Sequence, residues 1–205
     1  MALVALALAV SACGGGKKHG GTSPTTTKPK VLAIKTAILK VGKVDVESAG
    51  PPNVQIDPPT GRAVMTLAQK YIDNAVFAPL EKGTLGPEYA KLFDSGVKPV
   101  AIGADRNALT DLSVGKATNL TTKATPVLLS ALAGSLGELT YVATNFELRV
   151  KGTISKQKLG ITRYIEFTFA KTGKNWLVTA YRVRVIRATA SGTTTTTATA
   201  GSTKP

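Results

Sequence analysis

The sequence predicts an α+β domain in which a long N-terminal helix and several short helices pack on a curved four-stranded antiparallel sheet. Residues 62–78 follow the spacing of an amphipathic helix. Residues 118–188 are rich in Val, Ile, Thr, Tyr and Phe, which are enriched in strands, and turn signals divide them. Helical segments that all precede a run of strands are the order of an α+β domain.

Composition divides the 205 residues into four parts. Residues 1–12 are mostly apolar and predict a signal peptide. Residues 13–30 and 189–205 contain few large apolar side chains, and such segments bury too little surface to offset the entropy of ordering them. We therefore expect a flexible linker at 13–30, a domain at 31–188 and a disordered Thr-rich tail at 189–205.

The region before the main helix contains two short alternations of apolar residues, at 44–46 and 54–56, separated by Gly50-Pro51-Pro52. This pattern predicts two short strands around a turn. Thr60 is expected to cap the following helix. The apolar face of that helix combines Val64, Leu67, Ala68, Tyr71, Ile72 and Ala75.

Two short helices are expected next, one from Gly86-Pro87 to Gly96 and one over residues 105–112. The four strands are expected within residues 118–132, 138–155, 160–170 and 175–188. In the last strand the apolar positions change parity, which predicts a bulge near Thr179-Ala180. Trp176 is expected to anchor the core at the start of that strand.

Three segments carry a resemblance to a known fold. The main helix, the YAKLF segment at 89–93 and the closing hairpin FTFAKTGKNWLVTAYRVRV resemble the nuclear-transport-factor-like (cystatin-like) α+β roll over residues 60–188. The chain is also similar to small uncharacterised actinobacterial envelope proteins that carry this roll behind a lipid or membrane anchor. The resemblance implies a cone-shaped pocket between the long helix and the concave sheet.

Cys13 is the only cysteine and follows an apolar run of residues 2–10. That run is too short to span a bilayer, which needs about 20 residues. Val10-Ser11-Ala12-Cys13 resembles the bacterial lipoprotein cleavage motif. The resemblance implies export, removal of residues 1–12, acylation of Cys13 and anchoring to the outer face of the cell membrane. The alternative is an incidental or buried cysteine.

Residues with catalytic chemistry are few. His19 is the only histidine and lies in the expected linker, so histidine-based catalytic sites are excluded from the domain and we expect no metal or cofactor. Asp73, Glu147 and Glu166 fall out of phase with their apolar neighbours and are interpreted as solvated. Arg163 is in phase with apolar neighbours, and we interpret it as a strand end, with binding of a pocket anion as the alternative. No acid–base pair emerges.

The charge distribution suggests a binding function. The formal net charge is +14, and residues 142–188 contain ten Lys or Arg and two Glu. A basic face attracts polyanions. Arg149, Lys151, Arg182 and Arg184 are the residues predicted to bind an anionic surface, either anionic lipid or a wall polymer. Nucleic acid is not expected for an exported protein, and a protein partner is left open.

The predicted function is therefore that of a non-catalytic cell-envelope lipoprotein, a binding or accessory module whose ligand the sequence does not name. The alternative is a small pocket enzyme of isomerase or hydratase type on the same roll.

Overall fold

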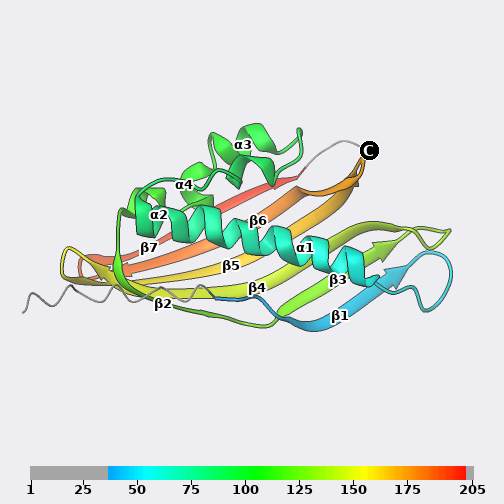
Figure 1. The fold of residues 1–205 in the computed structure, drawn as a ribbon, viewed down its shortest axis with the longest axis horizontal. Coiled ribbons are helices and arrows are strands. Elements are labelled where there is room, and N and C mark those ends of the chain that lie inside the picture. The colour runs from blue at the N-terminus through cyan, green and yellow to red at the C-terminus, as the bar shows by residue number, and fades with distance from the viewer. Residues whose placement is uncertain (1–36, 202–205) are drawn as a thin grey trace, which may run out of the picture. The chain divides into compact units, whose positions relative to one another are not determined.

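The computed structural model describes residues 37–201, which belong to one unit of the chain (Figure 1). The strands form a single seven-stranded sheet in the order β1-β3-β4-β5-β6-β7, and β2 also pairs with β4. The strands are β1 (Val41–Ser48), β2 (Thr118–Ala124), β3 (Val127–Ala133), β4 (Leu139–Ile154), β5 (Gln157–Thr172), β6 (Asn175–Thr189) and β7 (Gly192–Gly201).

The predicted fold, a long N-terminal helix on a four-stranded antiparallel cystatin-like sheet, is wrong. The sheet has seven strands and is mixed, because β1 runs parallel to β3 while the other pairs are antiparallel. The first described element is β1, not a helix. The pairing of β1 with β3 joins segments about 85 residues apart in the chain, so no local sequence pattern predicts it.

The segment 118–132, expected as one strand, is divided at Pro126. Proline has no N–H to donate to a ladder. Thr125 still bonds β4, since its N–H donates to the Glu147 carbonyl at 2.9 Å. The Val127 N–H instead donates to the Lys40 carbonyl at 2.8 Å. β2 and β3 therefore follow the same edge of β4, and β3 alone also pairs with β1.

Part of the tail expected to be disordered forms β7, which pairs antiparallel with β6 from Ala180 to Thr189. Threonine is β-branched and suits a strand whose faces are half exposed. Ala198 is buried under the helix side, and Ala200 packs against the same core. The scarcity of large apolar side chains predicted disorder here. A strand of small residues can nevertheless form where it pairs with the free edge of a neighbouring strand.

One continuous helical segment crosses the sheet, formed by α1 (Pro58–Tyr71), the π-helical η1 (Ile72–Phe77) and α2 (Ala78–Lys82). Asp57, not Thr60, caps it: the Asp57 carboxylate accepts the Thr60 N–H at 2.8 Å. The predicted apolar face is confirmed in the main, with Leu67 only partly buried. Its fully buried members are Val64, Ala68, Tyr71, Ile72 and Ala75.

The remaining helices are shorter than expected. The first expected short helix is reduced to a 3₁₀ turn, η2 (Tyr89–Lys91), and α3 (Lys98–Ile102) follows it. The second divides into α4 (Arg106–Leu109) and the 3₁₀ turn η3 (Leu112–Val114). Figure 1 shows all four α-helices on one side of the sheet, and α4 contacts β6 and β7.

The core lies between these helices and the inner face of β4, β5 and β6. Tyr71 packs edge-to-face on Phe167, with ring centroids 4.7 Å apart. The predicted bulge is confirmed, because Thr168 pairs with Ala180 and Phe169 with Val178, which leaves Thr179 unpaired between them. The predicted strand at 54–56 does not form.

Residues 1–36 lie outside the described part of the chain. They include the expected signal peptide and linker, and with them Cys13 and His19. Within residues 37–201, no helix has both the length and the apolar character needed to cross a bilayer.

Candidate functional site

The outer face of the sheet, opposite the helices, carries all four predicted anion-binding residues. Arg149 and Lys151 project from β4, and Arg182 and Arg184 project from β6; all four are exposed. The two pairs are not on adjacent strands, because β5 lies between β4 and β6. The alternation of burial along each strand places them together on one face.

Strand β5 contributes two side chains between these cations. Tyr164 lies across from Arg184, whose guanidinium carbon is 4.4 Å from the centre of the tyrosine ring. Glu166 lies across from Arg182 and accepts a hydrogen bond from the Asn145 amide at 3.0 Å. A stacked arginine retains its N–H donors at the edge of its plane, so Arg184 is held in place and is still able to bind an anion.

A hollow of about 360 Å³ lies among these side chains. It is lined by Asn145, Tyr164, Glu166, Arg182, Arg184 and Thr197. Together with Arg149 and Lys151, these residues form what we call the outer patch.

The arginines of the outer patch differ in whether an acidic side chain lies close to them. Arg149 forms an ion pair with Glu147, and this hydrogen bond raises the pKa of the arginine. Among residues 37–201, no carboxylate lies within 4.0 Å of the Arg182 or Arg184 guanidinium. Lys123 on β2 is exposed and lies across from Arg149. It adds a cation from outside residues 142–188, the segment on which the predicted basic face was based.

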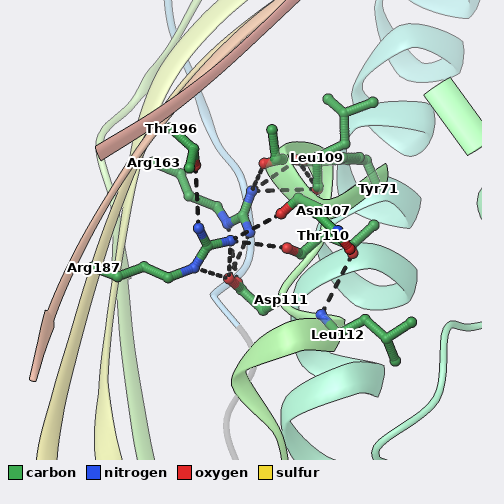
Figure 2. Close-up of polar contacts among 10 residues, drawn as sticks. Tyr71, Asn107, Leu109, Thr110, Asp111, Leu112, Arg163, Arg187 and Thr196 are labelled. Carbon is green, nitrogen blue, oxygen red and sulfur yellow. Dashed lines mark hydrogen bonds and ion pairs between the residues drawn. The ribbon is translucent and has the colours of Figure 1, made fainter. Parts of the chain in front are cut away.

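Two arginines of the same basic stretch do not belong to this face. Arg163 is fully buried in the middle of β5, so its interpretation as a strand end is wrong. The Arg187 side chain is 12% exposed and also points toward the helices. Figure 2 shows both guanidinium groups converging on Asp111 between the sheet and the helical segment.

Asp111 is the centre of this interior cluster. Its Oδ1 lies 2.6 Å from Arg163 Nη2 and 3.0 Å from Arg187 Nη2, and its Oδ2 accepts from Arg163 Nε at 3.0 Å. Burial is the largest influence on the Arg163 pKa and lowers it, but the Asp111 carboxylate and the Tyr71 hydroxyl together outweigh burial, so the arginine pKa is raised. Burial raises the pKa of Tyr71, whose hydroxyl also accepts from Arg163 Nη1 at 3.3 Å.

Both arginines also donate to backbone carbonyls at the end of α4. Arg163 Nη1 donates to the Ala108 and Leu109 carbonyls, both at 3.3 Å. Arg187 Nη2 donates to the Thr110 carbonyl at 2.9 Å. The last carbonyls of a helix have no partner within the helix and favour cations. The cluster therefore fastens residues 107–111 to β5 and β6.

This arrangement leaves no carboxylate oxygen of Asp111 directed at a substrate, because both oxygens accept from guanidinium groups. Of the acids weighed from the sequence, Glu166 is exposed, while Asp73 and Glu147 are partly buried at the surface. The enzymatic alternative depended on the pocket of the cystatin-like roll, and the observed sheet is a different one. Asp111 itself was not singled out, although an arginine in phase with apolar residues calls for a buried acid.

Comparison with family models, curated proteins and solved structures finds no match for this chain. The function is therefore inferred from the chemistry of the described residues.

Proposed function

We propose that this chain is a non-catalytic, lipid-anchored module of the cell envelope that binds the anionic headgroups of a membrane surface through the outer patch. One observation carries the proposal. Arg182 and Arg184 stand exposed on β6, two residues apart, with no carboxylate within 4.0 Å among residues 37–201. Guanidinium groups with free donors bind phosphate oxygens through short charge-assisted hydrogen bonds.

The sheet geometry supports contact with a surface rather than with a small enclosed ligand. The cations are spread over β4 and β6, on the face of the sheet opposite the helices of residues 37–201 (Figure 1). Each cation close to an anionic membrane contributes about 1 kcal/mol. Four such residues give a weak contact, and a lipid on Cys13 would make that contact persistent by holding the domain near the membrane.

Vesicle co-sedimentation tests the patch without the anchor. The full chain carrying Cys13→Ser is mixed with vesicles of phosphatidylcholine alone or of phosphatidylcholine with phosphatidylglycerol. Binding is expected only with phosphatidylglycerol, and it is expected to fall steeply between low salt and 0.15 M, where exposed charges are screened over about 8 Å. Replacing Arg149, Lys151, Arg182 and Arg184 by Gln should remove most of this binding.

A matched variant removes the same charge from the helix side. Lys82, Lys98, Arg106 and Lys116 belong to α2, α3, α4 and the loop before β2, so replacing these four by Gln leaves the outer patch intact. This control should bind nearly as well as the parent chain. If both variants lose binding to the same extent, binding depends on net charge and not on the outer patch. Equal binding of the parent chain to neutral and anionic vesicles would also contradict the proposal.

A further inference from the structure

A second basic region lies on the helix side of the sheet. It is an open groove of about 600 Å³ between the exposed side of α1 and the turn that joins β5 to β6. Arg62 and Lys70 of α1, Lys91 of η2 and Lys174 of the turn line it, together with Trp176. The lining residues include no Asp or Glu. The groove shares no residue with the outer patch.

The four cations converge from three separate segments of the chain. Arg62 and Lys70 are eight residues apart and therefore share one face of α1. Like charges gathered at one place repel each other, and a fold that needed them only for solubility would disperse them. Their convergence favours an anionic occupant that neutralises them.

Among residues 37–201, Glu88 is the only acid that forms ion pairs with these cations. Glu88 lies 2.7 Å from Lys91 Nζ and 3.6 Å from Lys70 Nζ, and the Lys91 hydrogen bond lowers the pKa of Glu88. Among residues 37–201, no carboxylate lies within 4.0 Å of the charged groups of Arg62 or Lys174. The groove therefore keeps an excess of positive charge.

Trp176 gives the groove an aromatic surface beside the cations. It was expected to be a core anchor, but it is only partly buried: it packs against the core and also lines the groove. An exposed aromatic face stacks on a ring of the ligand, while cations next to it bind the anionic groups that the ring carries.

We propose that this groove binds an anionic glycan, a sugar chain that bears phosphate or sulfate groups. A sugar ring lies against Trp176, and anionic groups of the glycan bind Arg62 and Lys174 in the same groove. An extended ligand suits the groove because its cations are exposed, with the Lys70 and Lys91 side chains 44% and 68% accessible. A nucleic acid strand fits less well, because its successive bases need several aromatic platforms and the lining offers one.

The fluorescence of Trp176 reports on this site directly, because it is the only tryptophan of the chain. The full chain carrying Cys13→Ser is titrated with heparin as a sulfated glycan, with phosphomannan as a phosphorylated glycan, with neutral dextran and with a single-stranded DNA oligonucleotide. We expect saturable changes in emission with one or both anionic glycans and none with dextran. The sulfated and phosphorylated probes distinguish the two sources of anionic groups.

Two double variants locate the binding. Arg62 and Lys174 are exposed, so Arg62→Gln with Lys174→Gln should leave folding intact and weaken glycan affinity about tenfold, equivalent to roughly 1.4 kcal/mol. Arg182→Gln with Arg184→Gln removes the same charge from the outer patch and should leave the titration unchanged. In the vesicle experiment, Arg182→Gln with Arg184→Gln should weaken binding and Arg62→Gln with Lys174→Gln should not. The two proposed sites can therefore be contradicted independently.

Several results would overturn the proposal. Equal affinity in the parent chain and the Arg62/Lys174 variant would place the binding elsewhere. Glycan binding detected by calorimetry without a change in Trp176 emission would also place the binding outside the groove. DNA binding tighter than that of both anionic glycans would identify a nucleic acid site, and a response to dextran would remove the role of charge.

Discussion

Arg163 and Asp111, which are 52 residues apart in the chain, form an ion pair in which both side chains are completely buried, with Nη2 and Oδ1 2.6 Å apart. Such a pair adds little net stability compared with apolar residues of the same volume, since both charges lose their water. What it supplies is specificity: it accepts only one placement of residues 107–111 against β5.

Removing either member of this pair is expected to destabilise the domain, and removing the acid should be worse. Arg163→Met leaves Asp111 with Arg187 as a partner, at 3.0 Å. Asp111→Ala leaves two guanidinium groups facing each other without a carboxylate. Loss of one partner of a buried pair costs about 3–5 kcal/mol. In urea unfolding, the loss of unfolding free energy should lie at the upper end of that range for Asp111→Ala and below it for Arg163→Met. A larger loss for Arg163→Met would contradict the bridging role of Asp111.

The Asp57 cap makes a pH-dependent contribution. Hydrogen bonds from Thr60 lower the Asp57 pKa below its usual 3.8, so the ionised form is favoured in the folded state. Its stabilising effect is therefore complete above pH 3.8 and is lost as the pH falls through the lower folded value. Asp57→Ala should cost about 1 kcal/mol at neutral pH.

The difference between the parent chain and Asp57→Ala should shrink when unfolding is repeated in acid. Asp57→Asn is the matched control, because asparagine caps helices without a titrating group and should retain most of the stability. A gap between parent and Asp57→Ala that is constant down to pH 2 would contradict the role of the carboxylate.

Strand β7 predicts that the Thr-rich tail stabilises the domain. A chain ending at residue 189 would expose the edge of β6 and the contacts of the buried Ala198. We expect a loss of at least about 1 kcal/mol, or roughly 2–4 °C in Tm for a domain of this size, and faster aggregation at the new edge. Removing only residues 202–205 is the control. Equal melting of the two shortened chains would show that β7 contributes nothing.

Cys13 is expected to carry lipid in a bacterial host. Labelled palmitate should enter the parent chain and not the Cys13→Ser variant, because this is the only thiol in the sequence. Labelling of both, or a mature protein that still begins at Met1, would end the lipoprotein interpretation while leaving the outer patch to its own test.

The sequence by itself determined the features that depend on neighbours along the chain. The apolar face of residues 62–78 repeats with the helical period, and its members Val64, Ala68 and Tyr71 are buried as expected. The change of parity after Val178 gave the bulge at Thr179. The exposure of Arg182 and Arg184 also followed from alternation, because side chains of a strand point to opposite faces in turn.

Tertiary structure alone decided the rest. A Thr-rich segment becomes β7 only because β6 has a free edge, and β1 becomes a parallel strand only because β3 lies beside it. The position of Arg163 in the alternation marked it as unusual, but its partner Asp111 comes from a different layer of the domain. The groove beside Trp176 likewise gathers cations from three segments. Each of these depends on contacts between residues far apart in the chain, which local periodicity does not encode.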